Sequence, residues 1–170
     1  GFSSRLTKLA LTSIVENDRI CRSPVQFPRF RKLKQLELQT VVDSHMSLPF
    51  LSNFIDACPV LHEFKLQCKS RSHTGKGFDG RPVGNVNGFD TVSEKIHRHL
   101  ITFEMVGFLG CKVDIELVLY LAQFAIFLEK IVLHPLLEED YCGQSKEESS
   151  RKQAKLLRDQ IPARVQLEVL

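Results

Sequence analysis

One pattern constrains the fold of this 170-residue chain more than any other: an apolar motif of the form Leu-x-x-Leu-x-Leu that recurs along it. Five copies are present: Leu6, Leu9, Leu11; Leu33, Leu36, Leu38; Leu61, Phe64, Leu66; Leu100, Phe103, Met105; and Leu128, Ile131, Leu133. They begin 27, 28, 39 and 28 residues apart, and a shorter alternation at Val165, Leu167 and Val169 ends the chain. A period of this length indicates a repeat architecture.

Each copy of the motif predicts a β-strand. Leu36 and Leu38 alternate with polar residues, which is the period of a half-buried strand. The interval between copies is long enough for a helical crossover, so the strands can be parallel. We therefore predict an α/β, leucine-rich-repeat-like solenoid with parallel strands on one face and helices on the other. Adjacent strands are expected, in this order, at Leu33–Leu38, Leu61–Leu66, Leu100–Met105 and Leu128–Leu133, with Val165–Val169 closing the edge.

Three helices are expected in the intervals, at Ser47–Ala57, Asp114–Phe127 and Lys146–Ile161. Asp114 has the chemistry of an N-cap. The longest apolar run, Leu117–Leu128, would extend about 18 Å as a helix, whereas a bilayer core is about 30 Å thick. The run is therefore predicted to be a buried helix, and no membrane partner is expected.

Composition indicates a globular domain and gives no sign of a nucleic-acid partner. Hydrophobic content of 43% and charged content of 25% are typical of a globular domain. The net charge, 23 − 20 = +3, is too small to indicate a nucleic-acid partner. The five cysteines are odd in number and form no CxxC pair, which favours a reducing, intracellular compartment, either cytoplasmic or nuclear.

No motif for catalysis or for cofactor binding is complete. The segment Thr74–Gly77 lacks the first Gly and the Ser or Thr of a phosphate loop. The spacings of a possible zinc set match no common pattern; its members are Cys58, His62, Cys68 and His73. We expect no metal, no cofactor and no enzymatic activity.

Two further groups are interpreted as structural. His97 and His99 are two residues apart before a strand, so at most one can point inward. The basic face of the last helix, formed by Arg151, Lys155 and Arg158, could contact phosphates. Its acidic neighbours favour a solvated surface instead.

The candidate binding surface is the set of outward positions on the strands, because stacked parallel strands form a continuous open face. Its residues are Gln35, Glu37, Gln39, Glu63, Lys65, Gln67, Thr102 and Glu104. The alternative is that these positions are only solvent-exposed. A glycine-rich segment between the third and fourth copies is a second candidate contact.

The recurring motif resembles a leucine-rich repeat in its irregular plant form. That family places Asn or Cys three residues after the third apolar position. Here those positions are Ile14, Val41, Lys69, Phe108 and Leu136. The Asn/Cys ladder of regular repeats is therefore absent.

The second half resembles the FBD module of plant F-box proteins. The matching segments are Leu100–Gly110, Asp114–Leu121, Phe127–Leu133, the basic helix Arg151–Arg158 and the closing Val165–Val169. Residues 27–67 resemble the repeats that usually precede that module. The implied organisation is irregular repeats in residues 1–69, a glycine-rich linker in 70–91 and an FBD-like module in 92–170.

This resemblance implies a non-catalytic protein-interaction module, the substrate-recruiting region of a cullin-type ubiquitin ligase receptor. In that family the F-box docks a Skp-type adaptor. We find no F-box here and interpret Gly1–Pro28 as a repeat plus a linker. Binding of the adaptor is thus expected only if an F-box lies upstream. The alternatives are a truncated or structural fragment without ligase function and, less favoured, an enzyme.

Overall fold

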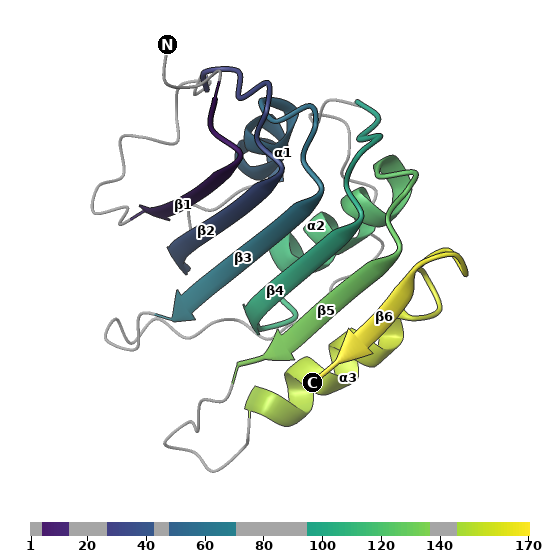
Figure 1. The fold of residues 1–170 in the computed structure, drawn as a ribbon. Coiled ribbons are helices and arrows are strands. Elements are labelled where there is room, and N and C mark those ends of the chain that lie inside the picture. Colours follow the sequence, from purple (N-terminus) through teal and green to yellow (C-terminus); the bar gives the residue numbers. More distant parts are fainter. Residues whose placement is uncertain (1–4, 14–26, 43–47, 71–94, 137–145) are drawn as a thin grey trace.

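A single six-stranded sheet with helices on one side forms the fold (Figure 1). The computed structural model describes residues 5–13, 27–42, 48–70, 95–136 and 146–170. The strands are β1 (Lys8–Ser13), β2 (Gln35–Val42), β3 (Glu63–Ser70), β4 (Thr102–Phe108), β5 (Lys130–Pro135) and β6 (Gln166–Val169). The helices are α1 (Leu48–Asp56), α2 (Lys112–Phe124) and α3 (Lys146–Leu157).

The strand order confirms the predicted repeat. The strands are parallel neighbours in the order β1 to β6, so each repeat contributes one strand beside its predecessor. Leu38 pairs in register with Leu66, and Leu66 pairs with Met105. The longer interval before the fourth copy therefore leaves the register intact.

The apolar positions of the motif all face the helices. These side chains form two rows across the sheet, on the side that faces the helices. The rows are Leu9, Leu36, Phe64, Phe103, Ile131, Leu167 and Leu11, Leu38, Leu66, Met105, Leu133, Val169. From β2 to β5 every member of these rows is buried. Figure 1 shows α1, α2 and α3 on this same side, and no described helix covers the other side. The predicted α/β layering is confirmed.

The start of α2 differs from the prediction. Its N-cap is Cys111, not Asp114. The carboxylate of Asp114 lies in the first turn and accepts hydrogen bonds from the backbone N–H groups of Leu109 and Gly110, at 2.9 and 3.1 Å. An acidic side chain in this position reaches back to the segment before the helix, as the acidic member of a capping box does. Asp114 thus fixes the β4–α2 connection while it lies inside the helix.

Two helices end earlier than the apolar pattern indicates. Helix α2 ends at Phe124 instead of Phe127, because Ala125 leaves the helical conformation and the chain turns toward β5. Helix α3 ends at Leu157 instead of Ile161, and i→i+3 bonds such as Arg158 N–H to the Lys155 carbonyl tighten the last turn. Both helices are therefore shorter at their C-terminal ends than the apolar pattern predicts. The predicted buried helix over Leu117–Leu128 is confirmed only as far as Phe124, because Ile126 and Phe127 lie beyond α2 and are exposed. None of the described helices combines the length and the apolar content that a membrane span requires.

One irregularity interrupts the sheet at Gly107. The register of β4 against β5 shifts between Val106 and Phe108, and Gly107 has a φ of 84°. A Cβ at this position would clash with the backbone carbonyl oxygen of Cys68 on β3. Gly107 is therefore required both by the backbone conformation and by the close approach of β3.

Parts of the predictions lie outside the described residues. These are most of the glycine-rich segment 70–91, including Thr74–Gly77 and His73. The division of the chain at residues 69 and 91 stays a prediction.

Candidate protein-binding face

The outward side chains of the strands form one polar surface, here called the open face. It contains the eight predicted residues, Gln35, Glu37, Gln39, Glu63, Lys65, Gln67, Thr102 and Glu104, all exposed or half-buried. The parallel register brings them into rows. Gln35 lies beside Glu63 and Glu63 beside Thr102, while Glu37 lies beside Lys65.

Side-chain hydrogen bonds connect neighbouring strands across the open face. Thr12 Oγ1 donates to Gln39 Oε1 at 3.4 Å, and Gln39 Nε2 donates to Gln67 Oε1 at 2.9 Å. Gln67 Nε2 in turn donates to Glu37 Oε1 at 2.6 Å. This relay runs over three strands and ends on a carboxylate. Long side chains that would otherwise rotate freely are therefore held in defined positions.

A second group of contacts centres on Glu104. Lys65 Nζ lies 3.2 Å from Glu104 Oε1, and His134 Nε2 lies 2.9 Å from the same oxygen. Ion pairs at such exposed positions contribute about 0–1 kcal/mol each to stability. Their main effect is to fix the positions of the charges, which alternate between neighbouring strands.

The open face extends beyond the predicted residues. On β5 and β6 it continues with Lys130, Val132, His134, Gln166 and Glu168, in register with the rows of β4. Lys130 Nζ lies 2.9 Å from Glu168 Oε2, which repeats the cross-strand charge pairing. The alternation at Ile131, Leu133 and Leu167 contained this signal, because their neighbours along each strand, polar except for Val132, must face outward.

A family model matches almost the whole chain. The model is described as At1g61320/AtMIF1, LRR domain, and it covers residues 2–168. The chain belongs to this family. No curated protein and no solved structure matches it.

Membership agrees with the irregular plant form of the repeat that the sequence resembles. Leucine-rich-repeat domains are generally non-catalytic interaction modules, so the family suggests a protein partner for this domain. Their stacked parallel strands present a continuous surface. In this leucine-rich-repeat domain the open face is that surface.

Three of the four residues considered as a zinc set, Cys58, His62 and Cys68, lie in the part of the chain that the structure describes. Cys58 is buried, and its thiol donates to the Phe54 carbonyl at 3.4 Å. Burial raises the pKa of Cys58 to about 12, so the thiolate that a metal requires is disfavoured. His62 Nδ1 is 2.8 Å from the Val60 carbonyl oxygen. Among the described residues no cluster of three metal-ligating side chains occurs.

The described cysteines are buried in the core, whereas the two neighbouring histidines lie in different surroundings. Cys58, Cys68 and Cys111 are free, and burial raises the pKa of each. Of the two neighbouring histidines, His99 is exposed and His97 lies in the interior between α1 and α2.

His97 joins a buried polar group. Its Nε2 is 3.0 Å from Tyr120 Oη and 3.5 Å from Asp56 Oδ1, while Lys95 Nζ lies 3.0 Å from Asp56 Oδ2. Burial lowers the pKa of His97, and the Asp56 carboxylate opposes that shift. These contacts connect α1 to α2 through the segment that precedes β4.

Proposed function

We propose that this domain is the substrate-recruiting region of an F-box-type ubiquitin ligase receptor, binding a protein target through the open face without catalysis of its own. The observation that carries the proposal is the open face itself: the helices that the structure describes all lie on one side of the six parallel strands. The FBD-like order of strand, apolar helix, strand and basic helix in residues 92–170 supports the receptor role.

Uncovered parallel sheets call for an explanation, because such sheets are usually buried on both faces. Here most of the outer side chains are polar, so the face is stable in water. Gln39, Gln67 and Glu37 are already held by their mutual hydrogen bonds. Binding a partner therefore costs less side-chain entropy than it would on a surface of freely rotating residues.

Charge on the open face is mixed. Acidic Glu37 and Glu104 flank basic Lys65 on adjacent strands, and Lys130 pairs with Glu168 farther along. A surface with alternating charges attracts no single class of polyanion or polycation. It fixes the register of a partner with complementary charges, which favours a specific protein target over nucleic acid.

The test compares two triple variants of the full-length gene product expressed in plant cells. The first, Glu37→Ala/Lys65→Ala/Glu104→Ala, removes charges from the open face. The matched control, Glu129→Ala/Glu148→Ala/Lys152→Ala, removes the same number of acidic and basic groups from exposed positions elsewhere. Proteins that co-purify with each variant are quantified by mass spectrometry.

We expect both variants to retain a Skp-type adaptor, and only the open-face variant to lose target proteins, by about tenfold or more. Retention of every target by the open-face variant would show that the surface is not the docking site. If the full-length product does not bind the adaptor, the ligase role is wrong and the alternative of a fragment without ligase function replaces it.

A further inference from the structure

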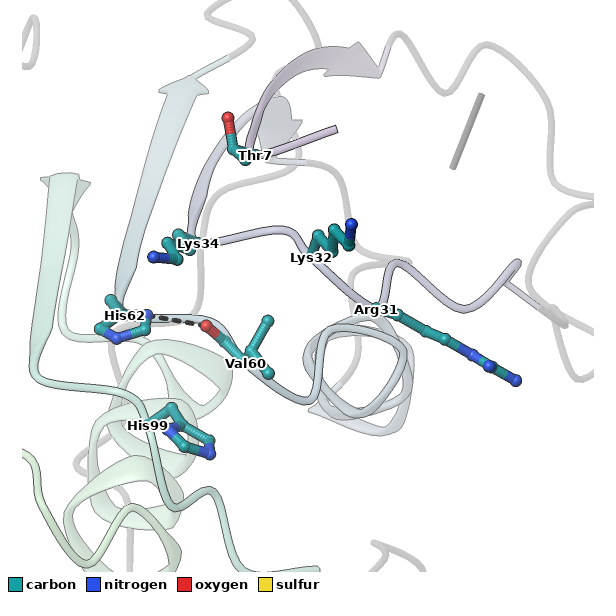
Figure 2. Close-up of a pocket in the computed structure, with 7 residues that line it drawn as sticks. All are labelled: Thr7, Arg31, Lys32, Lys34, Val60, His62 and His99. Carbon is teal, nitrogen blue, oxygen red and sulfur yellow. Dashed lines mark hydrogen bonds between the residues drawn. The ribbon is translucent and has the colours of Figure 1, made fainter. Parts of the chain in front are cut away.

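A basic hollow of about 570 Å³ lies where the first strands begin. Its residues are different from those of the open face. Its polar lining comes from the segments that precede β1 to β4: Thr7, Arg31, Lys32, Lys34, His62 and His99. Figure 2 shows Lys32 and Lys34 on one segment, the two histidines below them, and Arg31 extending away at the margin.

The repeat itself brings these residues together. The Lys34 N–H donates to the Thr7 carbonyl and the His62 N–H donates to the Lys34 carbonyl, each at 2.8 Å, so equivalent positions of successive repeats lie side by side. Lys32 lies two residues before Lys34. His99 lies two residues before Ile101, whose N–H donates to the His62 carbonyl in the same way. Basic side chains at repeated positions therefore become neighbours in space although they are far apart in sequence.

Positive charge in the hollow is not neutralised by the rest of the described chain. Among the described residues no carboxylate forms an ion pair with Arg31, Lys32 or Lys34. Other lysines do have such partners; Lys65 and Lys130, for example, lie 3.2 and 2.9 Å from glutamate oxygens. Uncompensated cations around a concave surface raise the local concentration of anions.

Hydrogen-bond donors accompany the charges. Because the Val60 carbonyl accepts from His62 Nδ1, that nitrogen carries a proton. Nε2 has no partner among the described residues, and it donates to an anion when the ring takes up a second proton. The His62 and His99 rings are 5.9 Å apart, and Thr7 adds a hydroxyl group. One small ligand can therefore reach several donors.

The lining selects the chemistry of the ligand. It has no carboxylate for a hard cation, and its two histidines fall short of the three side chains of a metal-binding cluster. It has no Phe, Tyr or Trp ring on which bases could stack. Its volume falls in the range of small-molecule sites, roughly 300–1,000 Å³, and exceeds the space that one phosphate group needs. We propose that this hollow binds a small polyphosphate. Lys32 and Lys34 contact separate phosphate groups, Thr7 donates a hydrogen bond, and the His62 and His99 rings donate in their protonated form.

Inorganic tripolyphosphate is the probe, added to the chain at constant ionic strength and measured by titration calorimetry. We expect saturable one-to-one binding that Lys32→Gln/Lys34→Gln weakens about tenfold or more. The matched control is Lys69→Gln/Lys155→Gln, which removes the same charge from exposed positions on β3 and α3. It should change the affinity less than twofold. Thermal melts verify that both variants are folded.

Ring signals of the histidines in NMR spectra localise the binding. Tripolyphosphate should shift the signals of His62 and His99 and leave His134, on the open face, unchanged. The proposal is overturned if binding does not saturate, if both double variants lose affinity equally, or if His134 shifts as much as the other two. A phosphoserine peptide that shifts the His62 and His99 signals while tripolyphosphate does not bind would also overturn it, since the phosphate would then belong to a protein partner.

Discussion

The two faces of the sheet are built from the same strands, yet their side chains are held in different ways. On the inner face Leu36, Phe64 and Phe103 are at most 2% exposed and pack against other apolar groups. On the open face Lys65 and Glu104 are 36% and 32% exposed and are positioned by polar contacts with particular atoms. Packing depends on volume and burial, whereas polar pairing depends on the identity of each partner.

Because of this difference, the inner face determines the stability of the fold and the open face is available for recognition. Burial of an apolar side chain contributes roughly 1.5–3 kcal/mol, several times the contribution of an exposed ion pair. The inner rows therefore determine whether the chain folds. The open face can vary in sequence with little cost to the fold, which is the property that a binding surface needs when repeats diverge.

The largest expected effect comes from the inner face. Leu36→Ala and Phe103→Ala should each lower the free energy of unfolding by roughly 2–5 kcal/mol, because each removes buried surface and leaves a cavity. Urea denaturation of the variants measures this loss. Thr102→Ala, which changes the open-face neighbour of Phe103, is the control, and a loss as large as that of Phe103→Ala would contradict the assigned orientation of β4.

A smaller effect is expected at Gly107, where the alternation of inward and outward side chains along β4 is interrupted. Gly107→Ala should lower the free energy of unfolding by about 1–3 kcal/mol, because alanine is strained at a φ of 84° and its Cβ meets the Cys68 carbonyl. Denaturation of this variant beside Val106→Ala separates strain from lost packing. Equal stabilities of Gly107→Ala and the wild type would show that the β4 irregularity relaxes without cost.

Sequence periodicity predicted the strand ladder because the inner face depends on a property that every repeat must preserve. Leu36 and Phe64 differ in shape but share apolarity and spacing, so the order of the strands followed from them. The eight residues of the open face that the sequence predicts were identified in the same way, since a residue between two inward positions points outward.

Details that depend on contacts between distant segments were not predictable. Aspartate is a residue type favoured at the N-cap, but the tight β4–α2 connection places Asp114 inside the first turn. The basic hollow joins Lys34 to His62 and His99 from separate repeats, and only their alignment in space shows that they are neighbours. The run of basic residues from Arg29 to Lys34 was the available signal. A local pattern does not show whether such charges are paired.

The smallest expected effect is on the open face, at the residue next to Leu36. Glu37→Ala should change the free energy of unfolding by no more than about 0.5 kcal/mol, although it removes the acceptor 2.6 Å from Gln67 Nε2. Water can replace that acceptor at a half-exposed position, so little stability is lost. Urea denaturation of Glu37→Ala and Leu36→Ala, measured in parallel, compares two neighbouring residues of β2. If the two neighbours lose similar stability, the open face is part of the folding core and is not free to serve recognition; a difference of several fold supports the separation of roles.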